Sequence, residues 1–318
     1  MISRTLSILL TLLLGTVLLL GVRGAGADEV KPPAVTLLDP GIGERATLRW
    51  NPETGIPVRM QMTMAMDMSL AFEGQAMPRV DLPAFVFDIM VIAEEPDENG
   101  LYPVRSVYEK VHLEGEIEPL MRRALLDALK PIEGAEISFT MDDRGIIGSI
   151  DMGKMPAHIL EMLGGENGAR QMVESMADPM PEEPVGVGAR WEVKQSLRQP
   201  NAPTIDSVLT YELVSRDGNH VQLRMVSIQT GEEQEFDPGV PGAKATLKSA
   251  SGRYEGEAFL RLNRIVPINA TNEGQMEFRF VLTERGVTQR MDQTIKVKVR
   301  MRELDADGRA PIDPANVG

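Results

Sequence analysis

The chain has 318 residues, contains no cysteine and carries a formal net charge of −14 at pH 7. Without cysteine the protein can form neither disulfides nor thiolate sites, so its hydrophobic core must stabilise it. The excess of acidic side chains disfavours binding to nucleic acid or to anionic membranes, and it favours solubility. We therefore expect no nucleic-acid partner.

The first 27 residues have the three parts of a cleavable secretory signal peptide. Arg4 supplies the positive charge, residues 6–20 form an apolar run, and Ala25-Gly26-Ala27 provides the small-residue cleavage site. The run is shorter than the ~20 residues that span a bilayer, which argues against an uncleaved anchor. Cleavage would remove two arginines and leave 31 basic against 47 acidic side chains, a net charge of −16. We expect an exported protein, periplasmic or extracellular, with no later transmembrane segment.

The mature chain is expected to form one continuous domain. Residues 28–43 are rich in Pro, Gly and charge, and they predict a flexible lead-in. Residues 44–304 are predicted to be a single β-rich domain, with a Pro- and Gly-rich connector at 178–188. The polar residues 305–318 are expected to form a frayed tail.

Val58–Phe72 carries the clearest strand signal, because apolar and polar residues alternate along it with period two. Its apolar side, which we call the Met face, consists of Met60, Met62, Met64, Met66, Met68, Leu70 and Phe72. Further strands are predicted at residues 45–51, 84–92, 102–113, 189–197, 207–215, 221–230, 252–263, 276–283 and 288–304. Residues 136–150 predict a hairpin around the turn Asp142-Asp143-Arg144-Gly145.

Two segments in the middle of the chain have helical spacing. Apolar residues recur every three to four positions in Ile117–Leu129 and again between Pro156 and Met176. Long strands with two helical zones between them predict the α+β class. The expected architecture is a large curved antiparallel sheet, similar to an incomplete barrel, with the two helical zones on its concave side or at its mouth.

The 20 methionines leave three interpretations open for the Met face. The first is ordinary core, with Met in place of Leu or Val. The second is an apolar ligand site, because thioether side chains adapt to varied partners. The third is a monovalent copper site. Alternate residues of one strand lie about 6.5–7 Å apart, which is too far for one ion, so we expect neither metal nor cofactor.

Catalytic motifs are absent from the sequence. His112, His158 and His220 fall in separate predicted elements, and Asp142-Asp143 has the composition of a turn. We therefore expect a non-enzymatic exported protein that binds an apolar small molecule, such as a lipid or an acyl chain, or an envelope protein partner. The alternatives are a carboxylate-based hydrolase, for which Asp67 is a weak candidate, and a purely structural envelope protein.

A basic stripe alternates along the last predicted strand, opposite its apolar residues. It has two interpretations, a solvated outer face that discourages edge pairing and a docking surface for an acidic partner. The stripe consists of Lys296, Lys298, Arg300 and Arg302.

The order of the elements carries a resemblance. The chain begins with a leader, long alternating strands and central helical zones. A Pro-rich connector that ends in VGVGARW (Val185–Trp191) follows, and more long strands come after it. This order resembles exported bacterial β-rich proteins of uncharacterised function. More distantly, residues 44–303 are similar in pattern to periplasmic lipoprotein carriers, whose curved sheet forms an incomplete barrel with helices over an apolar cavity. The resemblance implies a carrier of an apolar ligand.

Overall fold

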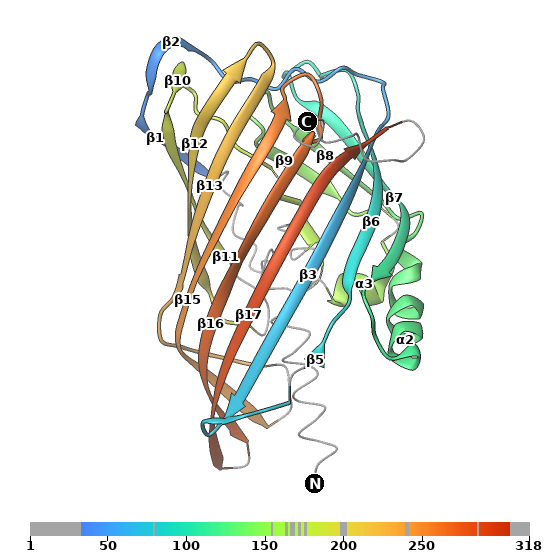
Figure 1. The fold of residues 1–318 in the computed structure, drawn as a ribbon, viewed down its shortest axis with the longest axis vertical. Coiled ribbons are helices and arrows are strands. Elements are labelled where there is room, and N and C mark those ends of the chain that lie inside the picture. The colour runs from blue at the N-terminus through green and yellow to red at the C-terminus, as the bar shows by residue number, and fades with distance from the viewer. Residues whose placement is uncertain are drawn as a thin grey trace, which may run out of the picture.

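The computed structural model describes one large sheet (Figure 1). The described residues are 33–305, except for gaps at 79, 154, 163–164, 166–168, 171–172, 175–176, 198–201, 239–241 and 285. The predicted signal peptide lies outside the described residues, and so do residues 306–318 of the predicted tail. No helix in the described part of the chain is long and apolar enough to cross a membrane.

The elements follow one another in two halves of the chain. The first half contains β1 (Ala34–Asp39), β2 (Ile42–Ala46), β3 (Val58–Phe72), β4 (Gln75–Ala76), β5 (Val80–Asp81), β6 (Ala84–Ala93), β7 (Tyr102–Glu114), α2 (Pro119–Leu129), a 3-10 turn (Lys130–Ile132), β8 (Glu136–Met141), β9 (Ile147–Asp151) and α3 (Ala157–Met162). The second half contains β10 (Val185–Val187), β11 (Arg190–Leu197), β12 (Ile205–Asp217), β13 (His220–Gly231), β14 (Gln234–Phe236), β15 (Ala243–Arg261), β16 (Asn269–Glu284) and β17 (Val287–Leu304).

Most of these strands belong to a single 15-stranded sheet whose described ladders are all antiparallel. The main order is β1-β11-β12-β13-β15-β16-β17-β3-β6-β7-β8-β9, and β2 forms a separate pair with β10. The β17–β3 ladder unites the two halves of the chain, with Ile295 opposite Met68 and Met301 opposite Met62. Figure 1 shows β15, β16, β17 and β3 side by side as the longest strands.

The sheet curves so that its apolar face encloses a core. One hydrophobic cluster contains Val193 of β11 and Tyr211 of β12 together with Val91 of β6 and Ile137 of β8. These strands stand far apart in the sheet order. They can share one cluster only because the sheet bends and brings its flanks together over one face.

The Met face has the alternation that the sequence predicts. Met60, Met62, Met66 and Met68 are between 5% and 8% exposed, while the residues between them are less buried. The outer face carries mixed charge, because Lys298 of the basic stripe pairs with Glu273 on the neighbouring strand β16. That pairing favours the solvated-face interpretation of the stripe over a docking surface.

The predicted α+β class is wrong, because the described chain has two short helices beside a sheet that dominates it. The first helical zone forms α2, which packs against β7 (Figure 1). Its apolar spacing does not build a continuous buried stripe: Leu120 is 74% exposed and Leu129 is its one buried residue. Within the second zone, the described helix is the six-residue α3, where Ile159 joins the core.

Two further segments differ from the sequence-based expectation. The predicted flexible lead-in contains β1, which pairs with β11 by placing Val35 opposite Val193 and Leu37 opposite Trp191. The strand predicted at 45–51 ends early, since β2 stops at Ala46. The Pro, Gly and charged residues around both segments weaken the local strand signal, and these strands depend on pairing with a partner that is distant in the sequence.

We expect Met66→Ala to lower the free energy of unfolding by about 2–5 kcal/mol, because it leaves a cavity in the core. Met66→Leu keeps the side-chain volume and should cost less than about 1.5 kcal/mol. Met77→Ala, at a position 41% exposed, is the matched control and should stay within about 0.5 kcal/mol. Urea unfolding followed by circular dichroism measures all three. A small, equal effect of both Met66 variants would contradict its place in the core.

Candidate functional site

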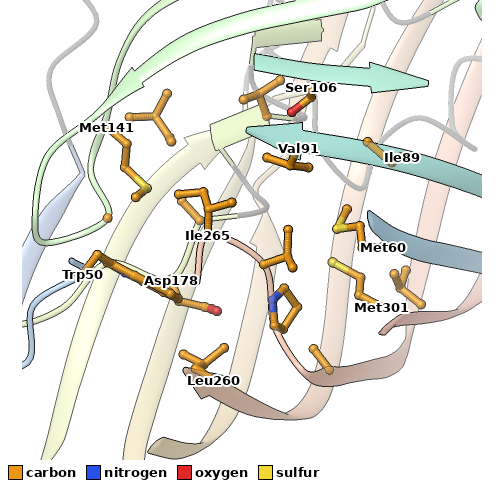
Figure 2. Close-up of a pocket in the computed structure, with 18 of the residues that line it drawn as sticks. Trp50, Met60, Ile89, Val91, Ser106, Met141, Asp178, Leu260, Ile265 and Met301 are labelled. Carbon is orange, nitrogen blue, oxygen red and sulfur yellow. The ribbon is translucent and has the colours of Figure 1, made fainter. Parts of the chain in front are cut away.

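A cavity of about 190 Å³ lies within the core that the curved sheet encloses (Figure 2). Strands from both flanks of the sheet line it, and most of the lining is apolar. The apolar side chains in its wall include those of Met60, Ile89, Val91, Ile137, Phe139, Met141, Leu209, Met225, Leu260, Ile265, Val299 and Met301. A mostly apolar pocket of this kind is where small molecules usually bind in proteins.

One carboxyl group interrupts the apolar wall. Asp178 lines the cavity beside Tyr211 of β12, and the Tyr211 hydroxyl donates a hydrogen bond to its carboxylate. Burial raises the pKa of Asp178 from 3.8 to about 6, although the hydrogen bond from Tyr211 acts in the opposite direction. Burial, together with the negative charge of Asp178, also raises the pKa of Tyr211 well above 10.0. A strongly perturbed acid in an apolar cavity is a candidate functional group.

Hydrogen bonds hold the segment that carries this acid. The Trp191 indole Nε1 donates to the backbone carbonyl of Pro179 at 2.8 Å. The backbone N–H of Met180 donates to the carbonyl of Arg144 at 2.8 Å, and Arg144 Nε donates back to the carbonyl of Met180 at 3.1 Å. Met180 is fully buried. The start of the predicted connector is therefore fixed against the core.

The next two residues of this segment are fixed by Arg49. Its guanidinium donates to the backbone carbonyl oxygens of Pro181 at 2.9 Å and Glu182 at 2.8 Å. Arg49 also lies 3.5 Å from the carboxylate of Asp143 in the β8–β9 turn. We call residues 178–182 the anchored segment, because contacts from three other parts of the chain position it.

Trp50 forms the wall of the cavity next to Asp178 (Figure 2). Both residues pack against Gly145, whose φ of +82° is a conformation that L side chains rarely adopt. A Cβ atom at Gly145 would lie 2.9 Å from Trp50 Nε1 and 3.0 Å from the backbone oxygen of Asp178. Within the described part of the chain, the buried Trp50 Nε1 has no hydrogen-bond acceptor. Glycine at this turn therefore permits the indole and the anchored segment to meet.

Aromatic stacking supports the other side of the acid. The rings of Trp191 and Tyr211 lie parallel, with centroids 5.5 Å apart and an interplanar angle of 9°. The β11–β12 register places these two residues directly opposite each other, and both are nearly inaccessible to solvent. Stacking in this buried position fixes the ring that carries the hydroxyl partner of Asp178.

The structure divides the predicted Met face between two regions. Met60 is the member that lines the cavity, and Met62 belongs to the same hydrophobic cluster. Met66 and Met68 belong to a second cluster further along the strands. The remaining members of the face pack against that second cluster and are Met64, Leu70 and Phe72. Ligand binding by the whole Met face stays a prediction.

The other polar candidates do not meet in a site. The Asp142 carboxylate accepts hydrogen bonds from the backbone N–H groups of Arg144 (2.9 Å) and Ile146 (2.8 Å), so it organises the hairpin turn. Asp67 lies opposite Lys296 in the β3–β17 ladder, away from the cavity. The three histidines lie in different elements. Among the described residues, no group of three or more His, Asp or Glu side chains could hold a metal ion.

Sequence reasoning missed Asp178, Tyr211 and Trp50. Asp178 begins a stretch rich in proline and glycine, and such composition normally indicates an exposed connector. Tyr211 has the inward position of a regular strand, which predicts burial and not a polar role. The available signal was the nearby Trp191, a large side chain that needs both a packed site and an acceptor for its N–H.

Comparisons with known proteins assign no family and no function to this chain. No protein-family model matches the chain, and no curated protein does. Among solved structures, it is similar to OpdL of Pseudomonas aeruginosa, with 7% identity, a TM-score of 0.21, and coverage of 78% of this chain and 99% of that one. It is also similar to the toluene transporter TodX of P. putida, with 9% identity, a TM-score of 0.17, and coverage of 84% of this chain and 96% of that one. These TM-scores are too low to establish a shared fold.

Asp178→Asn tests whether the buried acid destabilises the protein. Because the folded state holds the proton more tightly than the unfolded chain, stability should fall as the pH rises through about 4 to 6, which costs up to about 3 kcal/mol at neutral pH. The amide avoids this cost and can still accept from Tyr211. We expect the variant to be more stable by about 1–3 kcal/mol at neutral pH, with the gain disappearing near pH 4.

Urea unfolding at the two pH values measures this difference. Asp292→Asn is the control, because Asp292 is exposed on the outer face of β17 and the substitution removes the same charge. An equal gain at both pH values, or the same gain in the control, would show that burial of Asp178 is not the cause.

Proposed function

We propose that the protein is an exported, non-enzymatic binding protein that holds a small apolar molecule inside its curved sheet. The observation that supports this proposal is the apolar cavity of about 190 Å³ with a single carboxyl group in its described wall. Well-packed cores contain few voids larger than a water molecule, so a space of this size is not a packing defect of ordinary scale. The proposal that the protein is exported rests on the signal peptide predicted for the first 27 residues.

The volume limits the size of the ligand. A buried apolar cavity of about 150 Å³ is known to accept benzene, so this one has room for a single ring with a short substituent or for a short acyl chain. A membrane lipid with two long chains is much larger than the cavity. The proposal therefore narrows the expected lipid or acyl ligand to a small one.

The chemistry of the wall supports binding over hydrolysis. Carboxylate-based hydrolases use two acids on opposite sides of the reacting bond. Among the described residues of the wall, Asp178 is the acid, and its neighbour is the hydroxyl of Tyr211. This pair can orient a polar group of a ligand but does not provide the acid and the base that such a hydrolase needs.

Ethylbenzene is a suitable first probe, since it is apolar and fits the volume. The two tryptophans of the chain both report on the site, because Trp50 lines the cavity and Trp191 stacks on Tyr211. We expect ethylbenzene to change the tryptophan fluorescence saturably and to appear as a one-to-one adduct in native mass spectrometry. The same spectra of untreated protein would reveal a ligand that survives purification.

Filling the cavity should abolish this binding. Ala270→Leu adds volume at a wall position on β16 and should weaken ethylbenzene binding at least about tenfold. Ala65→Leu makes the same change on β3 at a position outside the cavity wall, and it should leave binding unchanged. Near-ultraviolet circular dichroism verifies that both variants keep their fold. The absence of saturable binding to the folded wild-type protein would refute the proposal.

A further inference from the structure

The charge of the cavity wall restricts which polar group a ligand can bring. Asp178 is the one carboxylate among the described residues that line the cavity, and these residues include no Lys, Arg or His. A ligand carboxylate would therefore meet a like charge and find no described counter-charge. In an apolar environment such a pair is strongly unfavourable.

The aromatic side chains near Asp178 favour the opposite charge. Trp50 and Tyr211 both line the cavity: Trp50 packs against Gly145 together with the backbone oxygen of Asp178, and the Tyr211 hydroxyl donates a hydrogen bond to the Asp178 carboxylate. The faces of Trp and Tyr rings attract cations, Trp most strongly, and the attraction grows when water is excluded. The Asp178 carboxylate, in a cavity wall that also contains the Trp50 ring, is thus suited to an ammonium group.

We propose that the ligand of this cavity is a small apolar amine, whose ammonium group pairs with the Asp178 carboxylate beside Trp50 and Tyr211. This inference rests on the proposed function, and it assigns the chemical class of the molecule that the cavity takes. The net charge of −14 acts in the same direction over a longer range, because an acidic protein concentrates cations near its surface.

An alcohol is the chemical class closest to an amine as a ligand for this cavity. The negative charge of the Asp178 carboxylate distinguishes an amine from an alcohol. A ligand hydroxyl could donate one hydrogen bond to Asp178, but it would leave the carboxylate charge without a counter-charge. A buried ion that lacks an opposite charge is costly, whereas a paired and hydrogen-bonded one is tolerated. The ammonium group supplies both the charge and the donors.

The experiment compares four molecules of similar size that differ in one group. Benzylamine, benzyl alcohol, ethylbenzene and benzoate are titrated into the purified protein at neutral pH, with tryptophan fluorescence and isothermal titration calorimetry as readouts. We expect benzylamine to bind at least about tenfold more tightly than ethylbenzene and benzyl alcohol, and benzoate to bind most weakly. Benzylamine affinity should fall at about pH 4.5, where Asp178 is protonated and uncharged.

Variants identify the group responsible. Asp178→Asn should reduce benzylamine affinity at least about tenfold and leave ethylbenzene affinity equal or higher, while Asp292→Asn should change neither. Ethylbenzene binding to Asp178→Asn also verifies that the variant keeps its cavity. If ethylbenzene binds the wild-type protein but benzylamine shows no advantage, or keeps its advantage in Asp178→Asn, the amine inference is overturned and the proposed function stands. If none of the four molecules binds, the proposed function itself is overturned.

Discussion

The burial of one apolar face by one sheet is the constraint on which this structure depends. Period-two alternation places the apolar residues of every long strand on the same side, and water must be kept from that side. The described helices contribute only a few side chains to this core, among them Leu129 of α2 and Ile159 of α3. The sheet therefore curves and buries the face against itself, so that Val193 of β11 and Val91 of β6 join one core.

Curvature alone would fill the interior evenly, but the inner face of β15 and β16 is interrupted by glycines. Gly256 points inward in register with Met225 and Asn272, both of which line the cavity. A Cβ at Gly256 would lie 3.0 Å from Met225 Cγ, and one at Gly274 would lie 2.7 Å from Tyr254 Cδ1. Neighbouring atoms thus occupy the space that a Cβ would need at these two glycines, one of which lies between residues of the cavity wall.

Local sequence pattern was enough to predict most long strands, because alternation depends on residues two apart, but the predicted segments 252–263 and 276–283 miss residues 243–251 of β15 and 269–275 of β16. The prediction at 58–72 agrees with β3 at both ends, and the hairpin at 136–150 agrees with β8 and β9. Pairing between β3 and β17 joins residues more than 200 positions apart, so no local pattern reveals it. The α+β prediction failed for the converse reason: the spacing of the two zones is locally helical, but the helices that form are short, and α2 has Leu129 as its one buried residue.

The site was hidden from the sequence because its key residue belongs to a segment with the composition of a loop. Asp178 is inside the protein because Trp191, Arg144 and Arg49 bind the backbone around it, and these residues come from three separate parts of the chain. Once Pro179 and Met180 are fixed, Asp178 is held in the wall of the cavity. An acid whose pKa is raised in an apolar cavity wall is a candidate for a group positioned for a partner. The anchored segment thus connects the fold to the binding of a ligand: the same hydrogen bonds that close the core place its one described acidic group in the cavity wall.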